Sequence, residues 1–300
     1  MRPTPLCPLL IATLAFVVPA TAHDEDPPKL LGRCTTQQLD EEPFSEWSRE
    51  GYTDYTPNPA ILEALRGTDT TGLDFTVFFG TWCGDSRREV PRLLKLFDAM
   101  GLPEGRVELI ALDRSDEALK QSPDGEERGR EIYRVPTLIV ERDGEELSRL
   151  VEYPVLSLER DLLAMLDGSG YAPSYAAYPV IRRWLGEGLL TDPNVSPWGL
   201  AEQLRHKING EGDLAAAARV LQTRGDLAEA VKLFEINCAL HRESARCHER
   251  LAAALLESGD RETAHKAAER ALRYNKDTER IEELSALLQE TGGNGTPSVD

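Results

Sequence analysis

Cys83 has the clearest chemistry of any side chain in this sequence. It lies in residues 80–91, GTWCGDSRREVP, where a serine stands at position 86. A cysteine thiolate attacks disulfides to form a mixed disulfide, and a second thiol must then release that adduct. Because the stretch holds one thiol, Cys83 is expected to perform the attack, whereas the release needs a thiol from elsewhere. Ser86 can donate a hydrogen bond to the thiolate but cannot replace the second thiol.

The neighbouring elements place Cys83 between a strand and a helix. Residues 73–79 (LDFTVFF) form a short apolar, aromatic and β-branched run, which predicts a buried strand. Residues 89–100 (EVPRLLKLFDAM) have the spacing of an amphipathic helix. A sulfur at the start of a helix faces unpaired backbone N–H groups and the positive end of the helix dipole, which favour the thiolate. Arg87 and Arg88 add positive charge one turn further on, while Asp85 opposes them.

The flanking segments complete an α/β domain. We expect a helix at residues 59–66, a strand at 107–113, two strands within 133–153 joined by a turn at 143–144, and a helix at 157–166. This order predicts an α/β domain over residues 45–167, with a central mixed sheet flanked by helices.

Further matches connect this domain with a known family. Pro91 lies eight residues after Cys83, and the segment Val135-Pro136-Thr137 directly precedes the predicted strand pair. Together with the WCG sequence at the strand-to-helix junction, these features resemble the thioredoxin family over residues 45–167. The resemblance is closest to a bacterial thioredoxin-like subgroup that carries WCGDS.

The resemblance implies roles for residues on two segments. The peptide bond before Pro136 is expected to be cis, so that a backbone edge beside the sulfur pairs with the substrate chain. The implied catalytic residues are Cys83, Ser86 and Pro136, and the implied substrate groove consists of Trp82, Gly84, Val135 and Thr137.

Two departures from the family affect the release of the mixed disulfide. Ser86 replaces the second cysteine, and Val77 stands where the family carries a buried acid, six residues before Cys83. We therefore expect thiol–disulfide exchange through a single nucleophilic cysteine, acting on protein thiols, disulfides or small thiols. The alternative is a non-catalytic binding or adaptor protein that uses the thioredoxin groove and a repeat surface.

The C-terminal part changes in composition and contains a repeat. Residues 224–240 (RGDLAEAVKLFEINCAL) align with residues 258–274 (SGDRETAHKAAERALRY) at a period of 34. This period and pattern resemble tetratricopeptide repeats and predict an all-α helical-repeat domain over residues 211–291 that binds a protein partner. Residues 168–210, with a helix near 179–186, are expected to be a connector, and residues 292–300 a disordered tail.

The N-terminus has the pattern of an export signal. Residues 1–22 combine Arg2, a short apolar run and an A-x-A site, which predicts a signal peptide cleaved after Ala22. The alternative is an uncleaved anchor. Cys7 precedes the apolar run, so it does not fit a lipoprotein signal. The mature protein is expected to be periplasmic or secreted, with a flexible N-terminal segment at residues 23–44.

Export makes disulfides available to the remaining cysteines. Cys238 and Cys247 flank a short turn between two predicted helices, which favours a structural disulfide, although two separate buried thiols are the alternative. Cys34 lies in the predicted flexible segment and is a candidate resolving thiol for Cys83. The alternatives for Cys34 are a pairing outside this chain or a free thiol.

The composition disfavours several other functions. A formal net charge of −18 repels nucleic acids and anionic membranes. The cysteines and histidines are not spaced as a metal site, and no phosphate-binding glycine loop is present, so neither a metal nor a cofactor is predicted. The remaining histidines are expected on solvated helix faces: His206, His241, His248 and His265.

Overall fold

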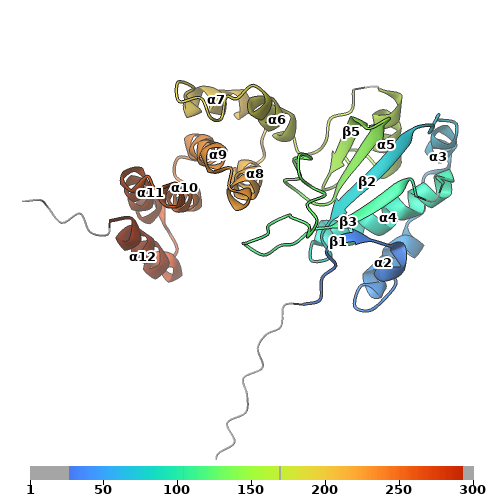
Figure 1. The fold of residues 1–300 in the computed structure, drawn as a ribbon, viewed down its shortest axis with the longest axis horizontal. Helices are drawn as coiled ribbons and strands as arrows, with labels where there is room; N and C mark the ends of the chain where they lie inside the picture. Colours follow the sequence, from blue (N-terminus) through green and yellow to red (C-terminus); the bar gives the residue numbers. More distant parts are fainter. Residues whose placement is uncertain (1–26, 104, 169, 293–300) are drawn as a thin grey trace, which may run out of the picture.

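The computed structural model describes residues 27–103, 105–168 and 170–292. A mixed β-sheet with helices forms the N-terminal half, and the C-terminal half is all-helical (Figure 1). The predicted signal peptide and residues 293–300 of the predicted tail lie outside the described residues. Within the described ranges, no helix is long and apolar enough to cross a membrane.

The sheet has five strands in the order β1-β3-β2-β4-β5. The central strand β2 is parallel to β3 and antiparallel to β4, and the other neighbours pair antiparallel. The β4–β5 hairpin turns at Asp143 and Gly144, which have φ values of 54° and 85°. Two successive left-handed residues suit the twist of a tight hairpin. The strands are β1 (Gly32–Cys34), β2 (Leu73–Phe79), β3 (Val107–Ala111), β4 (Thr137–Arg142) and β5 (Glu145–Val151). The predicted mixed sheet is confirmed.

Helices cover one face of this sheet. Alternate side chains of β2, such as Val77 and Phe79, pack into a core that includes Leu93 and Phe97 of one helix and Leu162 of another. Prolines and side-chain caps define several helix starts, including Asn58 before α3 and Ser157 before α5. The helices are α1 (Thr36–Leu39), α2 (Ser45–Asp54), α3 (Pro59–Arg66), α4 (Gly84–Met100) and α5 (Leu158–Asp167).

A loop covers the opposite face of the sheet. Phe78 of β2 packs there with Ile110 and Ile139 of the neighbouring strands and with Ile132 and Val135. The last two belong to the loop of residues 112–136, which therefore forms part of the core. This loop also brings the sequence Val-Pro-Thr back to the end of β2.

The predicted flexible segment at residues 23–44 is wrong for its described part. Strand β1 adds to the sheet edge beside β3, and a capping box at Thr35 begins α1. Leu39 and Phe44 are 1% and 8% exposed. Backbone pairing and apolar burial therefore order a segment whose composition suggested a loose chain.

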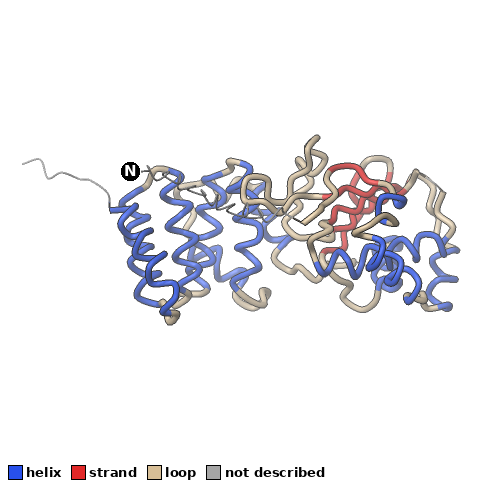
Figure 2. The backbone as a smooth tube through the Cα atoms, turned by 90° about the horizontal axis from the view of Figure 1, so that it is seen from below, coloured by secondary structure: helices blue, strands red, loops and turns tan. Residues whose placement is uncertain are grey.

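The C-terminal half is a stack of helices that extends away from the sheet (Figure 2). The starts of α8 and α10, and of α9 and α11, are each 34 residues apart (211 to 245 and 227 to 261), which matches the predicted period. Gly225 and Gly259 end α8 and α10 with φ near 90°, a conformation that favours glycine. The helices are α6 (Tyr178–Gly186), α7 (Pro197–Leu204), α8 (Glu211–Arg224), α9 (Leu227–Leu240), α10 (Ala245–Ser258), α11 (Arg261–Tyr274) and α12 (Ile281–Gly292).

The predicted connector belongs to the core of the helical half. Helix α6 confirms the expected helix near 179–186, and its Trp184 is fully buried with Leu214 of α8. The same core takes in Leu119 and Tyr133 of the loop 112–136. The two halves of the molecule therefore share this loop, which also carries part of the candidate site.

Candidate functional site

Cys83 caps the N-terminus of α4. Its φ and ψ are −91° and 126°, and the N–H of Arg87 donates to its carbonyl at 3.0 Å, which closes the first helical turn. The half-buried sulfur therefore lies at the positive end of a 17-residue helix. This placement agrees with the strand-to-helix junction expected from the sequence, with the helix beginning earlier than predicted.

The loop 112–136 brings a backbone carbonyl to the sulfur. Cys83 Sγ donates to the Val135 carbonyl oxygen at 3.3 Å. The Val135–Pro136 peptide bond is cis, as the resemblance implied. Two hydrogen bonds hold this segment: Thr137 Oγ1 donates to the Arg134 carbonyl at 2.7 Å, and the N–H of Glu152 donates to the Pro136 carbonyl at 2.7 Å.

Trp82 lies against the same loop. Its Nε1 donates to the Leu112 carbonyl at 2.8 Å, and its ring passes over Gly80. A Cβ at Gly80 would be only 2.5 Å from the ring, so this position needs glycine. A Cβ at Gly84 would meet nothing within 4 Å, so the space beside the sulfur is open there. The structure thus brings together the implied groove residues around Cys83.

Ser86 is fully buried beneath the start of α4. Its Oγ accepts a hydrogen bond from the N–H of Gly80 at 3.2 Å. No hydrogen bond from Ser86 to the Cys83 sulfur is present among the described residues. Val77 is likewise fully buried in the core with α4, so an apolar side chain fills the position where the resemblance expects an acid.

Lys120 is a charged neighbour of the site that sequence reasoning missed. It lies in the loop 112–136 with a φ of 54°, and its N–H donates to the Asp113 carbonyl at 2.9 Å. Asp113 directly follows Leu112, the residue that accepts the hydrogen bond of Trp82. This backbone pairing places Lys120 beside the Trp82–Cys83 segment.

The charges around Lys120 act on its pKa in opposite directions. Burial, followed by the cations Arg219 and Arg134, lowers the pKa of Lys120 to about 8, and the negative charge of the Cys83 thiolate acts in the opposite direction. At neutral pH the lysine is therefore mostly protonated and places a positive charge near the Cys83 sulfur. No sequence pattern signals this pairing, because it depends on how the loop folds back.

Replacing Lys120 with methionine is expected to slow the alkylation of Cys83 at pH 7 by about threefold, because the thiolate loses a nearby cation. The rates of native protein and variant should converge well above pH 8, where the native lysine is neutral. The alkylation rates at pH 7 and above pH 8 are measured with iodoacetamide by following the mass of the intact protein over time. An equal rate at pH 7 would show that Lys120 does not act on the sulfur.

The same variant is expected to change how the unfolding free energy depends on pH. Between about pH 8 and 10.5 the unfolded chain holds a proton on Lys120 that the folded chain has released. The unfolding free energy of the native protein should therefore rise with pH across this window relative to that of Lys120→Met. Urea denaturation at several pH values provides the measurement.

Cys34 does not lie where a resolving thiol was expected. It ends β1, opposite Leu109 of β3, and its sulfur donates to the Gly32 carbonyl at 3.2 Å. Cys34 packs against the core on the helix-covered face, whereas Cys83 packs with the cluster on the other face. Burial raises the pKa of the Cys34 thiol. The premise that Cys34 is mobile enough to reach Cys83 is therefore wrong.

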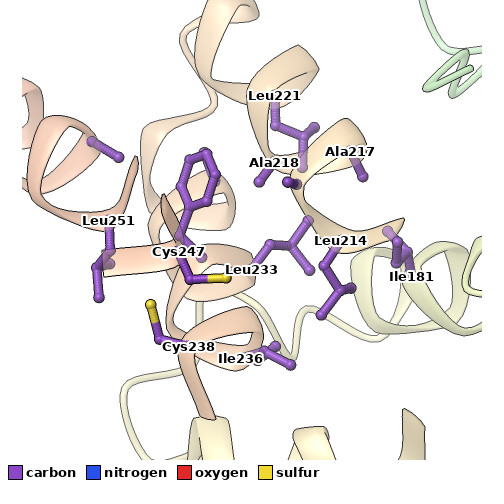
Figure 3. Packing of buried hydrophobic residues seen from close by; sticks show 14 of the residues in the cluster. Ile181, Leu214, Ala217, Ala218, Leu221, Leu233, Ile236, Cys238, Cys247 and Leu251 are labelled. Carbon is purple, nitrogen blue, oxygen red and sulfur yellow. The ribbon is translucent and has the colours of Figure 1, made fainter. Parts of the chain in front are cut away.

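Cys238 and Cys247 face each other between α9 and α10 (Figure 3). Both are buried free thiols in this structure, which matches the alternative of two separate buried thiols. A hydrogen bond between the two thiols, together with burial, raises the pKa of Cys238. The Cys247 sulfur also lies 3.4 Å from Glu211 Oε2. The two cysteines lie side by side as the sequence predicted, and a disulfide between them remains a prediction.

Arg134, directly before Val135, connects the site to the helical half. Its Nη2 donates to Asp213 of α8 at 2.8 Å, and its Nη1 pairs with Glu152. The guanidinium also lies 4.5 Å from the ring centroid of Tyr175. The three charged side chains are 14–19% exposed, so solvent screens this network only weakly.

The Arg134→Met variant is expected to lose about 3 kcal/mol of unfolding free energy, because Glu152 and Asp213 remain as poorly solvated carboxylates without their cation. Arg219→Met provides the matched control. Arg219 also bridges the two halves, to Asp116 at 2.9 Å, but the two side chains are 42% and 87% exposed. Its loss should cost no more than about 1 kcal/mol. Equal losses in urea denaturation would contradict the account.

Two histidines differ from the expected solvated position, and for His241 the buried atom is Nε2. His248 is 4% exposed rather than solvated, and burial lowers its pKa. Among the described residues, no group of three or more His, Cys, Asp or Glu side chains is arranged to hold a metal ion.

Comparison with protein-family models, with curated proteins and with solved structures finds no match to this chain.

Proposed function

We propose that this protein is a thioredoxin-like thiol–disulfide exchange protein that acts through Cys83 as its single nucleophile. The observation that carries the proposal is the position of the Cys83 sulfur, at the N-terminus of α4 and 3.3 Å from the Val135 carbonyl oxygen. The helix terminus and Lys120 place positive charge near the sulfur, and the open space at Gly84 leaves room for a substrate.

The exchange needs no external oxidant. The Cys83 thiolate attacks one sulfur of a substrate disulfide, a new sulfur–sulfur bond forms, and the other substrate sulfur leaves as a thiolate that takes up a proton. A thiol of the substrate or a small thiol then attacks the mixed disulfide, and Cys83 leaves as a thiolate. If that thiol belongs to the same substrate, the net result is isomerisation.

The positions of the other cysteines agree with release of the mixed disulfide by a thiol from outside this protein. Ser86 occupies the place of a second thiol, and Cys34 packs on the other face of the sheet. Cys238 and Cys247 are buried between helices of the C-terminal half. Protein disulfides and small thiols are therefore the substrate class that we propose.

The proposal also covers the role of the helical half and the cellular location of the protein. The 34-residue spacing of its helices supports a tetratricopeptide-like module that binds a protein partner. The sequence of residues 1–22 supports export to the periplasm or medium, where disulfide substrates are abundant.

The test is to react the protein with glutathione disulfide and to detect glutathione adducts by mass spectrometry of the intact protein. We expect one rapid adduct on the native protein and on Cys34→Ala, and loss of that adduct in Cys83→Ala. Adducts that persist at the same rate in Cys83→Ala would leave the non-catalytic binding role as the better description.

A further inference from the structure

A groove in the helical half concentrates positive charge on a strongly acidic protein. It has a volume of about 520 Å³ and is bordered by α7, α9, α10 and α11. Arg242, Arg270 and Arg273 line it, and Glu235 is the one acidic side chain among its described lining residues. The whole chain carries a net charge of −18, so this local excess of cations is opposite in sign to the rest of the molecule.

The arginines are available to a ligand. Arg270 and Arg273 are exposed on one face of α11, one turn apart, and neither forms an ion pair or side-chain hydrogen bond among the described residues. Arg242 lies 4.1 Å from the ring centroid of Trp198, and this residue is 46% exposed. Guanidinium groups that lack a protein partner suit carboxylates, which they bind through paired hydrogen bonds.

His248, one of the lining residues of the groove, offers a hydrogen-bond acceptor. Its ring lies beside that of Tyr274, with ring centroids 5.7 Å apart. Nε2 of His248 is 2.8 Å from the Arg242 carbonyl oxygen, so this nitrogen is the donor, and Nδ1 of the neutral ring is an acceptor. Nδ1 is buried without a hydrogen-bond partner among the described residues. A ligand N–H would satisfy it.

We propose that this groove binds an acidic peptide segment. Carboxylates would pair with the arginines, a backbone N–H would approach His248, and apolar side chains would pack on Trp198 and Tyr274. The volume lies within the range of sites for small ligands and short peptides. A nucleic acid fits less well, because the net charge of −18 on the whole chain repels a long polyanion.

This inference extends the partner-binding part of the proposed function and does not depend on the thiol chemistry of Cys83. The probe is a fluorescein-labelled peptide with four glutamates around one phenylalanine, and its counterpart carries glutamines instead. Fluorescence anisotropy with the full-length protein under reducing conditions gives the dissociation constants. Cys83→Ala should bind as the native protein does, so failure of the thiol proposal would leave this test intact.

We expect the glutamate peptide to bind, and Arg270→Gln and Arg273→Gln each to weaken binding by about tenfold. The matched control is Arg246→Gln, which removes an exposed arginine of α10 outside the groove lining and should change the affinity by less than about twofold. Added salt should weaken binding. The inference is overturned if neither peptide binds, if both bind equally, if the control loses as much affinity, or if a single-stranded oligonucleotide binds more tightly.

Discussion

Replacing Ser86 with cysteine is expected to give the protein dithiol reductase activity at least about tenfold above the native level. Ser86 lies one turn after Cys83 and is buried directly beneath the start of α4. Positions three residues apart on a helix are neighbours, and their Cα atoms fall within the separation that a disulfide spans. The new thiol could attack the mixed disulfide on Cys83, release the substrate and leave an intramolecular disulfide.

The turbidity of reduced insulin in the presence of dithiothreitol measures this gain. Ser86→Ala is the matched control, because it removes the hydroxyl that accepts from the Gly80 N–H without adding a thiol. The control should remain at the native level. If Ser86→Cys also stays there while folding normally, then the release step needs more than a second thiol, and the apolar Val77 would be the next position to change.

Replacing Cys83 with alanine is expected to have the opposite and equally large effect. The sulfur at the start of α4 is the thiol with both an open approach at Gly84 and a cationic environment. Cys238 and Cys247 are buried in the helical core, and the pKa of Cys34 is raised by burial. A substrate disulfide therefore has poor access to the two helical thiols, and disulfide exchange should depend almost entirely on Cys83.

Elements with local signals were predictable from the sequence. The apolar run of β2, the caps Asn58 and Ser157, and the turn at Asp143-Gly144 lie within the segments they define. The repeat period likewise predicted the spacing of helices α8 to α11. These features depend on neighbours in the chain, which a sequence shows directly.

Features that depend on distant partners were not predictable. Strand β1 has three residues and exists because it pairs with β3. Helix α2 contains Gly51, whose Cβ position would be 2.6 Å from Pro91 of α4, so close helix packing explains a glycine that reads as a breaker. Lys120 reaches the site through a loop that the helical half holds in place. His248 is buried by Tyr274, which follows it by 26 residues.

The candidate site shows the same division. The WCGDS and Val-Pro-Thr segments, which face each other in the site, were both identified from the sequence because each is a local motif. The contribution of α8 did not follow from any motif, since Arg134 reaches Asp213 across 79 residues of chain. The helical half therefore supports the loop that carries Val135, beyond its proposed role in binding a partner.

The most direct test of the central claim is to trap mixed disulfides in cells that produce the native protein, Cys83→Ala or Cys34→Ala. Free thiols are blocked with an alkylating agent before purification, and partners are compared on non-reducing gels and identified by mass spectrometry. We predict disulfide-linked partners with the native protein and with Cys34→Ala, and none with Cys83→Ala. Recovery of the same partners with Cys83→Ala, or of none with the native protein, would contradict the account.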